Sequence, residues 1–157
     1  MSAPRMSQVI VAKTFTHLSA DADKRTVITA LAEALGRARK MTPAQVAEIV
    51  EGALQRESIG STGIGHGIAI PHCRTAIVPE ILCAYGQAEG GLDFDSLDGE
   101  PVHSVFLLLT PPDQKENHLG LMKSFASQIR KEQFCDFLQQ VASAQALHDL
   151  LVEFENR

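Results

Sequence analysis

The chain has 157 residues, 45% of them hydrophobic, and carries a formal net charge of −5 from 14 basic and 19 acidic side chains. This length fits one domain that can bury a proper core. The acidic balance argues against a nucleic-acid-binding protein, whose surface is usually basic, and is compatible with a basic protein partner.

The cysteine content and the apolar runs indicate the compartment. There are three cysteines, at positions 73, 83 and 135, with no Cys-x-x-Cys pair. An odd count in this arrangement favours neither a disulfide framework nor a zinc site, so we expect a reducing, cytoplasmic environment. The apolar run Val9–Ala12 is too short for a signal peptide, and no segment approaches the roughly 20 apolar residues that span a bilayer. We expect no direct membrane insertion.

The N-terminal part of the chain begins with an ambiguous pattern, and a short strand is expected near Val9–Val11. A helical pattern follows, with apolar side chains recurring on one face at Val27, Ile28, Leu31 and Leu35. Gly36 and the basic residues 37–40 suit its C-terminal end, where the helix dipole favours cations.

A second helix has a clear start signal. Thr42 can cap it, Pro43 occupies the first helical position, and Gln45 completes a capping box. Its apolar face consists of Val46, Ile49, Val50 and Ala53. We expect this helix to end at the glycine-rich segment 60–67.

Three apolar runs in the middle of the chain predict strands. Residues 67–70 form a short buried run that Pro71 stops, and residues 81–85 form the second candidate. Residues 105–109 are the most hydrophobic run, which is typical of a central strand, and a Pro-Pro pair at 111–112 ends it.

Three helical patterns complete the chain, over about residues 122–129, 134–141 and 143–154. Helices first, strands in the middle and helices last predict a single layered α/β domain.

The stretch from Gly60 to Arg74 contains the strongest functional candidates. Its glycines, at positions 60, 63, 65 and 67, follow a helix and precede an apolar strand, and no P-loop lysine follows. This context disfavours nucleotide binding. The glycines are interpreted as a tight connection that needs positive φ, as a backbone surface for an anion, or as both. His72, held behind Pro71, is a candidate nucleophile or ligand, and its alternative is an ordinary strand-end histidine.

Two further residues are candidates for the same pocket. His118 lies near the start of a helix that follows a strand and a Pro-Pro break, so two histidines at strand ends of one sheet can meet. By itself, His118 also fits an ordinary surface position. Arg56 ends the second helix, where it either complements the helix dipole or faces His72 and stabilises an anion.

Other chemistries are disfavoured by spacing. His66 and His72 match neither one helix face nor a zinc-finger pattern, so we expect no metal site. Ser61 lacks the Gly-x-Ser-x-Gly elbow of a hydrolase. The aspartates at 93, 95 and 98 depart from a calcium-loop pattern and are more simply interpreted as part of a turn.

The segment Gly60-Ser-Thr-Gly-Ile-Gly-x-Gly-Ile-Ala-Ile-Pro-His72 resembles the active-site signature of the fructose/mannitol-type IIA proteins of the bacterial phosphoenolpyruvate:sugar phosphotransferase system. The resemblance is strongest to the nitrogen-regulatory IIA branch. It extends over about residues 8–155 and implies one IIA domain over residues 1–157, with a central mixed β-sheet flanked by helices. The chain departs from the usual pattern at His66, where asparagine is common, and at Cys73, where glycine is common. These departures bear on partner choice.

The resemblance implies a phosphoryl carrier that needs no cofactor or metal at this step. His72 would be the phosphoryl acceptor, His118 would hydrogen-bond the phosphoryl group, and Arg56 would stabilise its charge. The implied donor is HPr or its nitrogen-branch paralogue, and the downstream partner is a IIB domain or a regulated protein. The sequence leaves the oligomeric state open, a homodimer included.

Three roles remain open at this point. The lack of fused IIB, IIC or HPr segments in this sequence leans toward a regulatory IIA protein. A sugar-transport IIA protein that passes the phosphoryl group to a IIB cysteine is the alternative. A IIA-like binding module without phosphotransfer is a third, disfavoured by the joint presence of Arg56, His72 and His118.

Overall fold

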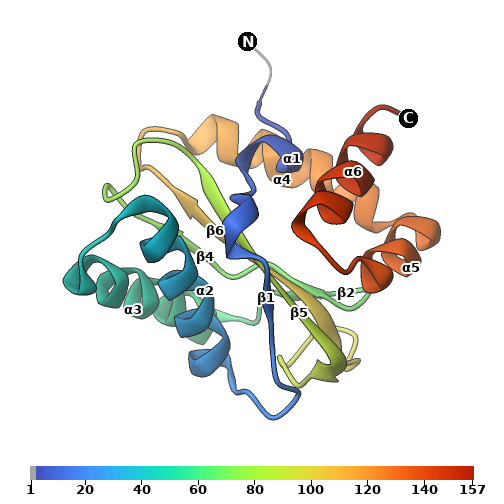
Figure 1. The fold of residues 1–157 in the computed structure, drawn as a ribbon, viewed down its shortest axis with the longest axis horizontal. Helices are drawn as coiled ribbons and strands as arrows, with labels where there is room; N and C mark the ends of the chain where they lie inside the picture. The colour runs from blue at the N-terminus through green and yellow to red at the C-terminus, as the bar shows by residue number, and fades with distance from the viewer. Residues whose placement is uncertain (1–2) are drawn as a thin grey trace.

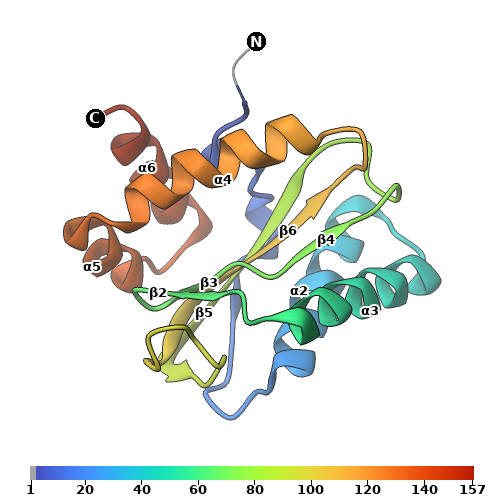
Figure 2. The ribbon, with the colours of Figure 1, turned by 180° about the vertical axis from the view of Figure 1, so that it is seen from behind.

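The computed structural model describes residues 3–157, which form one six-stranded mixed sheet with helices on both faces (Figures 1 and 2). The helices are α1 (Met6–Val9), a 3-10 turn (Ala12–Thr14), α2 (Lys24–Arg39), α3 (Pro43–Ile59), α4 (Lys115–Ile129), α5 (Glu132–Gln140) and α6 (Ala144–Glu155). The strands are β1 (Thr16–His17), β2 (Gly63–Gly65), β3 (Ile68–Ala69), β4 (His72–Arg74), β5 (Leu82–Leu92) and β6 (Val102–Thr110). The predicted α/β class and the mixed sheet flanked by helices are confirmed.

Strand β6 is the centre of the sheet, as its hydrophobicity predicted. The strand order is β1-β5-β6-β3-β2, and β4 also pairs with β6. β5 runs antiparallel to β6, whereas β3 and β4 run parallel to it. Every residue of β6 except His103 is buried. The strand therefore lies inside the fold along almost its whole length.

The sheet divides the core into two clusters. Along β6, Phe106 and Leu108 pack toward α1, α4, α5 and α6, where Phe106 contacts Phe125 with ring centroids 4.9 Å apart. Val105 and Leu107 pack toward α2 and α3 on the other face. Alternate side chains of one apolar strand thus bury two separate helical layers, as expected for a strand covered on both sides.

Strand β3 ends before Pro71, as predicted, but pairing with β6 does not stop there. β3 and β4 pair with β6 in one continuous register, with Ala69 opposite Val105 and His72 opposite Leu108. Pro71 has no N–H to contribute, but its carbonyl accepts the Leu108 N–H at 2.9 Å. His72 therefore lies within a paired strand, and its backbone is held by the centre of the sheet.

The strand expected at residues 81–85 is longer than predicted, since β5 continues to Leu92. The added part contains three glycines and one charged residue, Glu89, which disfavour strands locally. Pairing supplies the missing preference: Gly86 lies opposite Thr16 of β1 on one side and Val105 of β6 on the other.

The strand expected near Val9–Val11 is wrong. Met6–Val9 form helix α1, and only Ile10 makes an isolated bridge, to Cys83. The N–H and the hydroxyl of Ser7 donate to the Glu155 carboxylate, at 3.0 and 2.5 Å. The N-terminal segment is thus fastened to α6, a contact that a local pattern cannot contain.

The predicted starts of α3 and α6 are confirmed. The Thr42 hydroxyl accepts the Gln45 N–H at 3.1 Å, and the Gln45 side chain accepts the Thr42 N–H at 2.9 Å. Ser143 caps α6 in the same way, by accepting the Ala146 N–H. These caps satisfy helix N–H groups that would otherwise have no partner.

Gly36 lies inside α2 rather than beyond its end. The left-handed cap residue is Lys40, with φ of 55°. A Cβ atom at Gly36 would lie 2.6 Å from Cγ2 of Val46 on α3. Glycine at this position therefore permits the close approach of the two helices.

A Gly36→Ala variant is expected to be less stable, although alanine favours helix over glycine by about 1 kcal/mol. Overpacking against Val46 costs about 1–3 kcal/mol and is expected to prevail. Urea unfolding measures the difference. The Gly36→Ala/Val46→Ala double variant should lose less stability than the sum of the single variants, since the second change removes the clash. A Gly36→Ala protein more stable than the parent would contradict this packing.

Candidate active site

The structure brings His72 and His118 together. His72 begins β4 and His118 lies in the first turns of α4, which crosses the sheet face opposite to α2 and α3 (Figure 2). Their ring centroids are 5.6 Å apart, with 56° between the ring planes. Both side chains are half-buried, so each is held by the protein and still reaches solvent.

The proton position on His72 follows from one hydrogen bond. Its Nδ1 lies 2.9 Å from the carbonyl oxygen of Ile70. A carbonyl oxygen can only accept, so Nδ1 carries the hydrogen and Nε2 of the neutral ring carries the lone pair. Within residues 3–157, Nε2 has no hydrogen-bond partner. The free lone pair is thus on the nitrogen remote from the strand.

His118 is fixed through its other partner, Thr110, the last residue of β6. The Thr110 hydroxyl lies 2.7 Å from Nδ1 of His118. Burial lowers the pKa of His118 below its usual 6.5, and the nearby charges of His72 and Arg74 lower it further. His118 is therefore neutral at neutral pH.

Strand alternation adds Arg74, which the sequence reasoning did not single out. Because side chains two residues apart share a face, Arg74 lies on the His72 side of β4, and its charge reaches His118. Cys73 points the other way, into the core cluster against Gly52 of α3. A strand predicted over residues 72–74 would have placed Arg74 on the His72 side and Cys73 on the opposite side.

Arg56 is placed beside the glycine segment. It lies in the last turn of α3, and its guanidinium donates to the Gly60 carbonyl at 2.9 Å. In the part of the chain that the structure describes, no hydrogen bond or ion pair joins Arg56 to either histidine. The structure thus brings the two histidine rings close together and bonds Arg56 to the glycine segment instead.

The glycine segment is a tight connection in which residues 65–67 have positive φ, which is one of the two interpretations predicted from the sequence. Gly65 has φ of 96° and Gly67 of 77°, at the turn between β2 and β3. His66 between them also has positive φ, 59°, and its N–H donates to Asp98 at 3.2 Å. Asparagine and histidine both tolerate this region, which explains how His66 fits there.

The family assignment follows from comparison with known proteins. The family described as "Phosphoenolpyruvate-dependent sugar phosphotransferase system, EIIA 2" matches residues 10–154. The chain belongs to this EIIA 2 family.

Relatives of this EIIA 2 chain have both regulatory and transport names. It is 37% identical to the nitrogen regulatory protein of Pseudomonas aeruginosa over 119 residues, which are 76% of this chain and 77% of that protein. It is 35% identical over 129 residues to the fructose-specific EIIABC component of Bacillus subtilis, covering 82% of this chain and 20% of that protein. The chain is therefore a member of a family of phosphotransferase-system phosphoryl carriers, and nitrogen regulatory proteins are among its homologues.

Solved structures agree with the EIIA 2 fold. The crystal structure of nitrogen regulatory protein IIA-Ntr from Neisseria meningitidis matches with a TM-score of 0.80 and 28% identity, covering 93% of this chain and 98% of that one. IIA mannitol of Escherichia coli matches with a TM-score of 0.71 and 21% identity, covering 88% and 96%. A complex of the E. coli IIA mannitol enzyme with phosphorylated IIB mannitol also contains this fold, with a TM-score of 0.73 and 20% identity, covering 92% and 99%.

Other candidate sites of this EIIA 2 chain have structural partners. Ser61 donates its hydroxyl to the Phe94 carbonyl and accepts the Gly63 N–H. Asp98 accepts the N–H of Glu100 at a turn. Among residues 3–157, no three His, Cys, Asp or Glu side chains lie close enough together to hold a metal ion. In the same residues, no helix has both the length and the apolar character of a membrane span.

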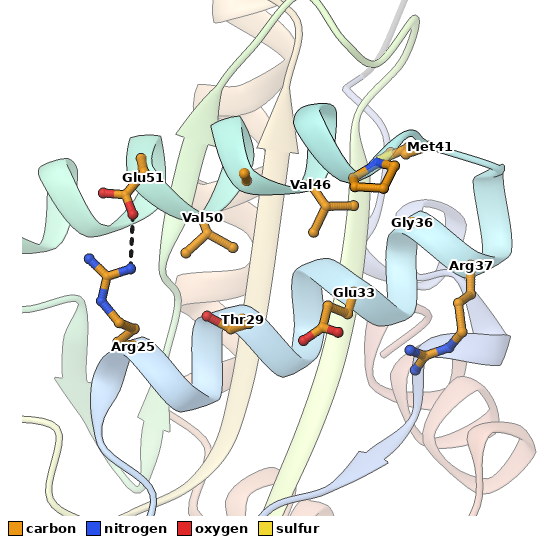
Figure 3. Close-up of a pocket in the computed structure, with 11 residues that line it drawn as sticks. Arg25, Thr29, Glu33, Gly36, Arg37, Met41, Val46, Val50 and Glu51 are labelled. Carbon is orange, nitrogen blue, oxygen red and sulfur yellow. Dashed lines mark hydrogen bonds and ion pairs between the residues drawn. The ribbon is translucent and has the colours of Figure 1, made fainter.

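A separate groove of about 540 Å³ lies between α2 and α3 (Figure 3). Val46 and Val50 line it, and the Arg25–Glu51 ion pair, 2.8 Å long, closes one end. α2 and α3 cover the sheet face opposite to α4. The groove is therefore distinct from the histidine pair.

Proposed function

We propose that this EIIA 2 protein accepts a phosphoryl group on Nε2 of His72 from HPr or its nitrogen-branch paralogue, and that it serves a regulatory role. The observation that carries the proposal is the hydrogen bond from Nδ1 of His72 to the Ile70 carbonyl. It orients the imidazole and, in the neutral ring, leaves the lone pair on the free nitrogen Nε2. Transfer then requires mainly positioning and charge stabilisation.

The transfer step balances without a cofactor. The Nε2 lone pair forms a new P–N bond as the P–N bond to the donor's histidine breaks, and that bond's electron pair returns to the donor imidazole. The hydrogen on Nδ1 of His72 stays on that nitrogen throughout and is donated to the Ile70 carbonyl. In the onward step a nucleophile of the acceptor forms a bond to phosphorus as the P–N bond to His72 breaks, and that bond's electron pair returns to Nε2.

Three neighbouring groups suit an incoming anion. With the Thr110 hydroxyl donating to Nδ1 of His118, the Nε2–H of His118 becomes a donor for the phosphoryl oxygens. Arg74 adds positive charge on the same face. We assign Arg56 a weaker role, through its hold on the Gly60 carbonyl.

The regulatory role is supported by the nitrogen regulatory protein of P. aeruginosa, to which this chain is 37% identical. The alternative, sugar transport, is supported by the fructose-specific relative of B. subtilis and by the fold likeness to IIA mannitol, whose complex contains phosphorylated IIB. In that case a IIB domain accepts the phosphoryl group. A binding module without phosphotransfer would leave the oriented lone pair of His72 without use.

Phosphotransfer from radiolabelled HPr, or from its nitrogen-branch paralogue, tests the proposal. We expect label on this protein that is stable in base and labile in acid, as for a P–N bond. Labelled protein is then mixed with IIB domains. Retention of the label supports the regulatory role, and rapid loss of the label to a IIB domain supports transport. No labelling by either donor would refute the carrier function.

Phosphorylation of His72 is expected to raise the pKa of His118. Burial, followed by the charges of His72 and Arg74, holds it below 6.5 in the unphosphorylated protein. A phosphoryl group adds about −1.5 to −2 charges, which favour the protonated imidazole nearby. NMR titration of the His118 ring before and after phosphorylation measures the change. A pKa that stays the same would place His118 out of reach of the phosphoryl group.

A further inference from the structure

Glu57 is a buried carboxylate next to the glycine segment, and only 3% of its side chain is exposed. It lies in the last turns of α3, and its oxygens accept three hydrogen bonds. The donors are Nζ of Lys24 at 3.0 Å, the Thr62 N–H at 2.9 Å and the Thr62 hydroxyl at 2.5 Å. A carboxylate is costly to bury without such partners, so this set accounts for its burial.

Thr62 connects this carboxylate to His72. Its backbone carbonyl accepts the Ile70 N–H at 3.0 Å. The Ile70 carbonyl in turn accepts Nδ1–H of His72 at 2.9 Å. The path from Glu57 to the imidazole therefore runs through two residues, and each link is a hydrogen bond or the backbone of one residue.

The hydrogen bonds from Glu57 through Thr62 lead to Ile70, whose carbonyl determines which nitrogen of His72 carries the hydrogen. Ile70 lies between the short strand β3 and Pro71, outside the paired residues of β3 and β4. The N–H of Ile70 bonds to Thr62 and its carbonyl to His72, so Thr62 anchors the backbone of the residue whose carbonyl holds the imidazole. Thr62 itself is 4% exposed, and Glu57 bonds it through both its N–H and its hydroxyl.

The other end of the network ties it to the rest of the fold. Lys24 opens α2 and bonds both Glu57 and Asp95, at 3.0 and 3.2 Å. Burial acts to lower the pKa of Lys24, but the hydrogen bonds to Glu57 and Asp95 outweigh it and raise the pKa, so the ammonium stays charged. The glycine segment is thus bonded to the end of α3 through Glu57 and, through Lys24, to the start of α2.

We propose that Glu57 is a positioning residue for phosphoryl transfer: through Thr62 it holds the Ile70 carbonyl against Nδ1 of His72 and so keeps the lone pair on Nε2. This inference rests on the proposed function of His72. It assigns the carboxylate no contact with the phosphoryl group. Its effect is on which nitrogen is free to react.

The test uses two variants and a matched control. Glu57→Gln keeps the shape but removes the charge and one acceptor oxygen, and Thr62→Val removes only the hydroxyl. Glu51→Gln is the control, because Glu51 also lies on α3 and pairs with a basic residue of α2, Arg25, at 2.8 Å, but has no bond to the glycine segment. Thermal unfolding identifies any variant that does not fold, and Thr62→Val then carries the test.

Two readouts are measured on each protein. Long-range ¹H–¹⁵N NMR of the free protein reports the His72 tautomer, and rapid-quench transfer from the phosphorylated donor protein reports rate and KM separately. We expect the control to match the parent. Glu57→Gln and Thr62→Val should populate both tautomers and lose roughly 10-fold or more in transfer rate with KM little changed, since a misplacement of about 1 Å can cost about 100-fold.

The outcomes separate the two proposals. A parent tautomer in both variants would overturn the positioning role, whatever their transfer rates. An equal change in Glu51→Gln would also overturn it, because the effect would then belong to general α2–α3 packing. If the parent protein accepts no phosphoryl group, the proposed function fails, and the tautomer measurement still decides whether Glu57 orients His72.

Discussion

A His72→Ala variant is expected to accept no phosphoryl group from the phosphorylated donor protein. His72 is the half-buried histidine whose Nε2 lone pair is free, because Nδ1 is bonded to the Ile70 carbonyl. Without the imidazole no nitrogen remains to form the new P–N bond, so the loss should be complete rather than partial. Labelling with radioactive donor, followed by gel separation, measures it.

The matched control for this variant is His148→Ala. His148 is an exposed histidine on α6, with 52% of its side chain accessible, so its removal tests only for a general effect of losing an imidazole. Its labelling should equal that of the parent. Full labelling of His72→Ala would refute the assignment of His72 as acceptor.

A His118→Ala variant is expected to bind the donor normally and to transfer slowly, by about 100- to 1,000-fold, the range typical of losing one donor to a developing anion. The ring centroid of His118 lies 5.6 Å from that of His72, and the Thr110 hydroxyl orients it. Rapid-quench transfer kinetics measure the rate, and titration calorimetry with unphosphorylated donor measures the binding.

Two further variants separate the hydrogen bond from the bulk of the ring. His118→Gln keeps an N–H donor and should recover part of the rate. Thr110→Val keeps the shape of the buried Thr110 but frees the imidazole to rotate, so an intermediate rate is expected. Transfer at the parent rate in His118→Ala would remove His118 from the site.

Much of the fold could be predicted from local chemistry. The Thr42–Pro43–Gln45 start of α3 is confirmed because a capping box satisfies its own helix N–H groups within four residues. The central place of β6 is confirmed because a run apolar on both faces must be covered on both faces. These features depend on neighbours in the chain or on hydrophobicity alone.

The sequence-based predictions were incomplete where contacts between residues far apart in the chain determine the local structure. Pro71 interrupts the strand as expected, but the sequence did not predict that pairing with β6 resumes in the same register at His72. The second half of β5 has poor strand propensity, but Gly86 and Gln87 at its start pair with β1 on one side and β6 on the other. The candidate site shows the same dependence on distant contacts, since the sequence analysis singled out neither Arg74 nor Thr110.

The sequence by itself determined the starts of α3 and α6, the central strand, the α/β class and, through the Gly60–His72 signature, the family and its candidate histidine. Only the tertiary structure decided which nitrogen of His72 is free and that His118 faces it. It also decided that Glu57, 15 positions before His72 in the chain, connects to Nδ1 through Thr62 and Ile70. The physical reason is that residue types determine which groups can donate or accept a proton, whereas the folded backbone determines which of them meet.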